Sequence, residues 1–137
     1  MNYDLNRFLV PQERDYARAL AEIRAGRKRS HWIWYIFPQL RGLGYSYNAE
    51  FYGITDAEEA RQYLAHPVLG ARLREITGAL LELTENDPVR VMGRPDDLKL
   101  CSSLTLFEHV AEPDSVFGRA LDKYYGGKRD AATLRML

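Results

Sequence analysis

The sequence predicts an all-α fold, a compact single-domain bundle of about six to seven helices with one long aromatic loop. Apolar residues recur at helical spacing along most of the chain, and proline and glycine separate these stretches. Runs with strand character are scarce, because "IWYIF" finds no partner of similar composition. The 137 residues suit one ordinary domain, and no repeat or linker divides residues 1–137.

Two helices are expected near the N-terminus. A short one is predicted around residues 4–9, and a longer one begins at Pro11, which suits a first helical turn. The longer helix ends at Gly26. Its apolar face is formed by residues at helical spacing: Tyr16, Ala19, Leu20 and Ile23.

The next two helices meet at His66 and Pro67. The first opens with Thr55 and Glu58, which have the spacing of a capping box. It ends before Pro67, because proline disfavours helix in the residue that precedes it. The helix after Pro67 is the best candidate for the central core helix. Its apolar stripe consists of Leu69, Leu73, Ile76, Leu80 and Leu83.

The C-terminal part of the chain is also helical by pattern. Residues 87–93 form a short helical segment, and a longer helix begins at Pro95. Another helix starts near Pro113 and ends at Gly126, and Asp130 caps the last one. The helix after Pro95 has an apolar face made of Leu98, Cys101, Leu104 and Phe107.

Residues 26–55 are neither cleanly helical nor cleanly extended, and they include both tryptophans of the chain. Long loops inside small domains are uncommon and often functional. An indole face can stack on a flat ring while nearby cations hold an anionic group. We expect Trp32, Tyr35 and Phe37 to serve mainly in packing, and Trp34 and Gln39 to line a pocket. His31 is the acid–base candidate if a reaction takes place.

A second cluster lies in "DDLKLCSSLTLF". Consecutive serines are poor helix formers because their hydroxyls compete for backbone groups. They indicate a helix end, an exposed face or a ligand contact, and Lys99 favours the ligand contact. The polar candidates are Lys99, Ser102, Ser103 and Thr105. Cys101 is interpreted as a small apolar core residue.

Composition narrows the classes of partner. Nineteen basic residues balance nineteen acidic ones, so a nucleic-acid partner is not favoured, although a local basic patch remains open. A single cysteine, no signal-peptide pattern and no apolar run long enough for a bilayer predict a cytoplasmic protein without a membrane partner. Glycine-rich phosphate motifs and metal-ligand spacings are missing from the sequence, so no metal and no cofactor are expected.

Four stretches together resemble a bacterial domain-of-unknown-function family, eighteen-ten, whose members are often labelled calpastatin-like. The stretches are "GRKRSHWIWYIFPQLRGLGYSYNAEFYGI", "EARQYLAHPVLGARL", "DDLKLCSSLTLFEHV" and "DAATL". The resemblance implies a small helical domain and brings no established activity. Calpain inhibitors of that kind are disordered and polar, unlike this chain. The family's motif falls here on Lys28, Ser30, His31, Trp32, Trp34, Tyr35, Gln39, Lys99, Ser102, Ser103, Thr105 and Asp130.

Three functional hypotheses follow. In the first, the chain binds, or binds and processes, a small anionic ligand with a flat ring, such as a nucleotide or an ADP-ribose-like metabolite. Its site would combine His31 as the acid–base group with Lys28, Ser30, Trp32, Trp34, Gln39, Lys99, Ser102, Ser103 and Thr105 as ligand contacts. In the second, the basic and aromatic segment 24–39 binds a protein or a nucleic acid. In the third, all these residues serve folding alone.

Overall fold

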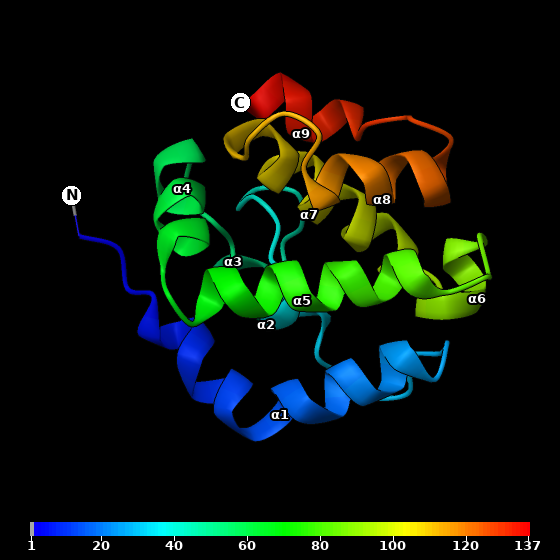
Figure 1. The fold of residues 1–137 in the computed structure, drawn as a ribbon. Coiled ribbons are helices and arrows are strands. Elements are labelled where there is room, and N and C mark those ends of the chain that lie inside the picture. The colour runs from blue at the N-terminus through cyan, green and yellow to red at the C-terminus, as the bar shows by residue number, and fades with distance from the viewer. Residues whose placement is uncertain (1) are drawn as a thin grey trace.

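The structure is a computed structural model that describes residues 2–137. Within that range, the regular secondary structure consists of α-helices (Figure 1). This confirms the all-α class. The described residues contain nine helices instead of about six to seven, because the aromatic loop itself holds two short ones. The nine are α1 (Asn6–Arg24), α2 (Ile33–Ile36), α3 (Tyr47–Phe51), α4 (Ala57–Ala65), α5 (Leu69–Glu82), α6 (Pro88–Met92), α7 (Asp96–Val110), α8 (Val116–Tyr125) and α9 (Ala131–Met136).

The N-terminal segment is one helix, and the predicted break at Pro11 is wrong. Pro11 lies inside α1, where its missing N–H removes one backbone hydrogen bond. Packing offsets that loss. Phe8 is fully buried, and the Gln12 amide donates hydrogen bonds to the carbonyl oxygen of Tyr35, at 2.8 Å, and to the Tyr63 hydroxyl, at 3.0 Å. The residues on either side of Pro11 are therefore fixed to the rest of the fold.

Capping at the start of α4 is shifted by one residue from the predicted Thr55–Glu58 pair. The Asp56 carboxylate accepts a hydrogen bond from the backbone N–H of Glu59, at 2.9 Å. The Glu59 carboxylate accepts one from the backbone N–H of Thr55, at 2.7 Å. Asp56 is the better cap because its carboxylate carries the negative charge that a helix N-terminus favours. The predicted end of α4 before Pro67 is confirmed.

The most central helix is α7, not α5 as the apolar stripe suggested. It contacts α2, α4, α6, α8 and α9, whereas α5 lies between α1 and α8 (Figure 1). Every residue from 102 to 107 is buried, and Leu98, expected on the apolar face, is 58% exposed. The middle of α7, residues 102–107, is surrounded on all sides, so this part of the helix shows no apolar stripe for a sequence pattern to detect. Within the described residues, no helix is both long enough and apolar enough to cross a membrane.

Candidate functional site

The two ends of the aromatic loop are joined by backbone hydrogen bonds. The N–H of Ile54 donates to the carbonyl oxygen of Gln39, at 2.9 Å, and the N–H of Arg41 donates to that of Ile54, at 2.8 Å. An isolated β-bridge between Leu40 and Ile54 results. Residues 41–53 form the tip of the loop, which includes α3. The bridge fixes the tip beside α2 and the start of α7.

A hollow of about 420 Å³ lies where the loop tip, α2, the start of α7 and the start of α9 meet. We call it the Trp34 hollow. It is lined by Trp34, Gln39, Leu43, Gly44, Tyr45, Ser46, Ala49, Pro95, Leu98, Lys99, Ser102, Asp130 and Ala132. The aromatic stretch and the lysine–serine stretch, which are far apart in the sequence, therefore contribute to one concave site.

Lys99 provides a positive charge in the Trp34 hollow. Its ammonium nitrogen lies 4.8 Å from the centre of the Trp34 ring and 3.3 Å from an oxygen of Asp96. The other oxygen of Asp96 lies 2.8 Å from the ammonium of Lys28, which is 5.0 Å from the centre of the Trp32 ring. One carboxylate thus serves two ammonium groups. The cluster retains one net positive charge, since two positive charges face one negative charge.

Gln39 is 9% exposed, and its side-chain amide forms no hydrogen bond with any described residue. Its nitrogen and oxygen are not among the fully buried polar atoms that lack a partner, so they are open to the hollow. Its neighbours Pro38 and Leu40 are buried, and its carbonyl oxygen is held by Ile54. The amide is therefore presented to the hollow by a fixed backbone.

Two further polar groups of the hollow act as acceptors. The Ser102 hydroxyl donates its proton to the carbonyl oxygen of Leu98, at 3.2 Å, so it offers lone pairs to the hollow. One Asp130 carboxylate oxygen accepts from the backbone N–H and the hydroxyl of Thr133, at 2.9 and 2.6 Å, and thereby caps α9. Thr105 lies behind this cap, because its hydroxyl accepts the backbone N–H of Asp130 at 3.0 Å.

Four of the residues predicted as ligand contacts line the Trp34 hollow: Trp34, Gln39, Lys99 and Ser102. The other candidates do not line it. Lys28 lies on the far side of Asp96, where it lines a different hollow of about 580 Å³, and Thr105 reaches the site only through Asp130. The candidate base His31 is exposed on the loop before α2, and Ser103 is fully buried with its hydroxyl unpaired among the described residues.

Ser30 and Trp32 belong to a structural cluster around Glu22, which sequence analysis missed. The Glu22 carboxylate accepts hydrogen bonds from the Ser30 hydroxyl at 2.6 Å, from Trp32 Nε1 at 2.9 Å and from the backbone N–H groups of Arg29 and Ser30. Burial alone would raise the pKa of Glu22, but these donors outweigh it and lower the pKa to about 2. No local pattern marks Glu22, because its partners lie in a loop of irregular structure.

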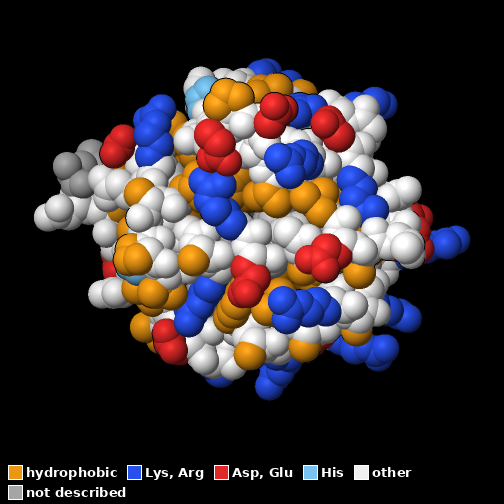
Figure 2. Space-filling view, in the orientation of Figure 1, with side chains coloured by type: hydrophobic (Ala, Val, Ile, Leu, Met, Phe, Trp, Pro, Cys, Tyr) orange, Lys and Arg blue, Asp and Glu red, His pale blue; other side chains and the backbone are white. Residues whose placement is uncertain are grey.

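The aromatic part of segment 24–39 is mostly packed. Trp32, Tyr35 and Phe37 are at most 6% exposed, as expected for packing residues. They therefore present no free ring face on which a nucleic-acid base could stack. Acidic and basic side chains also alternate over the face seen in Figure 2, which shows no extended patch of one charge near its centre.

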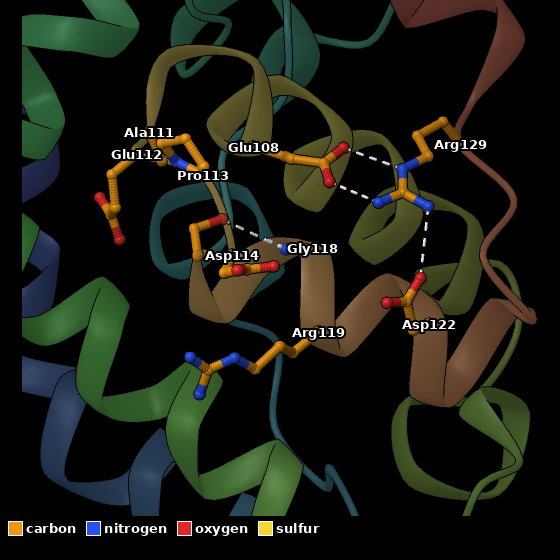
Figure 3. A pocket seen from close by; sticks show the side chains of 10 residues that line it. Glu108, Ala111, Glu112, Pro113, Asp114, Gly118, Arg119, Asp122 and Arg129 are labelled. Carbon is orange, nitrogen blue, oxygen red and sulfur yellow. Dashed lines mark hydrogen bonds and ion pairs between the residues drawn. The ribbon is translucent and has the colours of Figure 1, made fainter.

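A smaller hollow, of about 260 Å³, lies between α7 and α8. Figure 3 shows Arg129 directed at Glu108 and Asp122 within it. Arg129 binds both oxygens of Glu108, and a Cβ on Gly118 would lie 2.6 Å from one of them. This ion pair connects α7 to the segment before α9, and we interpret it as structural.

Two kinds of chemistry receive no support from the geometry. Within residues 2–137 the structure gathers no set of three His, Cys, Asp or Glu side chains able to hold a metal ion. Burial and the nearby Asp130 raise the pKa of the Cys101 thiol to about 11. A thiol with that pKa is a poor nucleophile at neutral pH, because little thiolate is present.

Comparison with known proteins reveals a relative of the same fold. The chain is similar to the conserved hypothetical protein Rv1873 from Mycobacterium tuberculosis, with 48% sequence identity and a TM-score of 0.96. The match covers 98% of this chain and 96% of that one. A comparison with curated proteins finds none that matches. A family model described as a protein of unknown function (DUF1810) matches residues 2–137, so the chain belongs to that family.

Proposed function

We propose that the Trp34 hollow binds a small molecule that carries a flat ring and an anionic group. The observation that carries this proposal is the convergence of Trp34, Gln39 and Lys99 on one hollow. The Gln39 residue is nine-tenths buried, yet its amide is open to the hollow and has no partner among the described residues. A ligand in the hollow would provide hydrogen bonds to this amide.

The other lining groups define what the ligand looks like. Trp34 is half-buried, and Tyr45 at the rim is 92% exposed, so two aromatic rings border the space. Lys99 is the cation of the lining, and an anionic group close to it would share its ammonium with Asp96. The volume of about 420 Å³ lies within the range of small-molecule pockets.

The proposal concerns binding and not catalysis. His31, the acid–base candidate, does not line the hollow, and Cys101 is poorly suited to act as a nucleophile. The remaining polar groups of the lining are suited to hold a ligand through hydrogen bonds and charge.

Thermal unfolding with a panel of ring-bearing anions tests the proposal. The panel contains nucleoside 5′-monophosphates and phenyl phosphate, each at about 1 mM. A ligand that is present at 100 times its Kd stabilises the folded state by about 2.7 kcal/mol, enough to raise Tm by several degrees. Lys99→Ala should remove most of this shift.

The matched control is Lys123→Ala. Lys123 also lies over an aromatic ring, Tyr124, but on α8 and outside the hollow. This variant should keep the full ligand-induced shift. If no compound shifts the wild-type Tm, or if the shift survives Lys99→Ala, the hollow is not a site for anions.

A further inference from the structure

We propose that the bound ring carries a hydrogen-bond donor next to an acceptor, and that Gln39 recognises this edge. The inference rests on the proposed function and names the chemical class of its ligand. A nucleoside 5′-monophosphate with a purine base fits this description. Adenine offers its 6-amino group beside N1, and hypoxanthine and guanine offer N1–H beside O6.

The Gln39 amide can both donate and accept a hydrogen bond. A glutamine side chain presents an N–H donor and a carbonyl acceptor side by side. Only an edge with the reverse order, an acceptor beside a donor, satisfies both at once. Asparagine and glutamine recognise adenine in DNA through such paired hydrogen bonds. A ligand that offers two acceptors or two donors would leave half of the Gln39 amide unpaired.

The backbone of Gln39 is held by its neighbours. Gln39 follows the buried Phe37 and Pro38, and its carbonyl oxygen accepts a hydrogen bond from Ile54 at 2.9 Å. The backbone N–H of Arg41 completes the same bridge by donating to the carbonyl oxygen of Ile54, at 2.8 Å. The backbone of Gln39 is held in place, so the side chain starts from a fixed point on the wall of the hollow. The side chain keeps its own rotamers, and the bound edge selects the one that pairs both the N–H and the carbonyl oxygen of the amide.

The lining of the hollow carries both hydrogen-bond donors and acceptors. Ser102 offers lone pairs because its proton is donated to Leu98, and Asp130 offers a carboxylate. On the donor side, the lining residues carry the Gln39 N–H, the Lys99 ammonium, the Trp34 indole N–H and the hydroxyls of Tyr45 and Ser46. The lining therefore suits a ligand that has both donors and acceptors and one anionic group. The amino group and hydroxyls of a nucleotide, together with its phosphate, have this composition.

The test is the substitution Gln39→Glu, which keeps the shape and replaces the N–H donor with a second acceptor. Binding of AMP, IMP, GMP and phenyl phosphate is measured by titration calorimetry and by quenching of tryptophan fluorescence. In wild type we expect AMP and IMP to bind more tightly than phenyl phosphate. In the variant, their affinity should fall about tenfold or more, the typical effect of losing a paired contact to a base.

GMP gives the sharpest outcome, because its N1–H and 2-amino group are adjacent donors that a glutamate can accept together. The ratio of AMP affinity to GMP affinity should therefore fall at least about tenfold in the variant. The control is Asn48→Asp, which adds the same charge on the exposed face of α3, outside the lining. It should leave the ratio unchanged.

Each failure has its own pattern. If Gln39→Glu lowers the affinity for AMP, IMP and GMP equally, the added charge repels phosphate and Gln39 does not recognise an edge of the base. If wild type binds phenyl phosphate as tightly as AMP, and Lys99→Ala abolishes both, the binding site stands and the edge recognition is wrong. If no compound binds wild type, both proposals are wrong.

Discussion

The ammonium group of Lys99 lies 4.8 Å from the centre of the Trp34 ring. The same arrangement occurs between Lys28 and Trp32, at 5.0 Å, and Asp96 binds both lysines. The two tryptophans differ in one respect. Trp32 is 1% exposed, whereas Trp34 is half-buried and borders the hollow. The protein therefore contains two similar lysine–tryptophan pairs, one in the core and one at the candidate site.

Truncation of the two tryptophans should separate folding from binding. Trp32→Ala should lower the free energy of unfolding by about 3–5 kcal/mol, because a large core side chain is lost. Trp32→Ala also removes the Nε1–H group that donates a hydrogen bond to the Glu22 carboxylate. Trp34→Ala should cost no more than about 2 kcal/mol, since part of its ring is already exposed, but it should abolish the ligand-induced rise in Tm. Urea unfolding of both variants is the measurement. Equal losses of stability would show that Trp34 is a core residue as well.

Glu22 should make folding sensitive to acid. Its pKa is lowered from the usual 4.5 to about 2 in the folded state, so the unfolded state takes up its proton first as pH falls. The stabilisation from this group is fully present above pH 4.5 and is lost between about pH 4.5 and 2. The free energy of unfolding, measured in urea at several pH values, should therefore fall less for Glu22→Gln than for wild type between about pH 4.5 and 2.

A matched control for the Glu22 experiment is Glu82→Gln. Glu82 is exposed at the end of α5, and its side chain forms no hydrogen bond or ion pair with a described residue. The free energy of unfolding of this variant should fall with decreasing pH as that of wild type does. At pH 7, Glu22→Gln should be the less stable protein by about 1–3 kcal/mol, because its amide cannot accept all four donors. Parallel pH curves for wild type and Glu22→Gln would disprove the role assigned to this carboxylate.

Local sequence rules identified most helices and several of their ends. The proline after His66 and the aspartate at 130 act within a few residues, so their effects are visible in sequence. Pro11 was misjudged because tertiary contacts of Phe8 and Gln12 outweigh a local helix-breaking tendency. The central position of α7 is not visible in the sequence, because burial of residues 102–107 on all sides removes the amphipathic pattern there.

The candidate site was partly visible for a chemical reason. Lys99 is conspicuous in the sequence, because lysine is usually exposed and here lies near two serines in an otherwise apolar helix. Gln39 is conspicuous because it is a polar residue that follows a run of aromatic residues. The role of Asp96 is not visible in the sequence, because an aspartate in a first helical turn already has a local explanation. Tyr45 was not singled out either, since only the fold brings the loop tip to the hollow.

Two of the buried hydroxyls of α7, those of Ser103 and Thr105, should respond differently to removal. The Ser103 hydroxyl has no partner among the described residues, so Ser103→Ala should leave stability unchanged or raise it by up to about 1 kcal/mol. Thr105→Val keeps the shape but removes a donor to the Cys101 carbonyl and the acceptor of the Asp130 N–H. It should lower stability by about 1–3 kcal/mol. Chemical unfolding distinguishes the two, and a large loss for Ser103→Ala would reveal a partner for its hydroxyl.

Two glycines of α5 form the last comparison, because the same substitution should have opposite effects at each. A Cβ on Gly70 would lie 2.0 Å from the carbonyl oxygen of Leu64, so α4 and α5 could no longer meet as closely. Gly70→Ala should therefore lower the free energy of unfolding by about 3 kcal/mol or more. A Cβ on Gly78 meets no atom within 4 Å, and its helical backbone suits alanine. Gly78→Ala should raise stability by about 0.5–1 kcal/mol, since alanine loses less conformational freedom on folding. Measured by urea unfolding, a tolerated Gly70→Ala would mean that the corner between α4 and α5 is looser than the contact with Leu64 indicates.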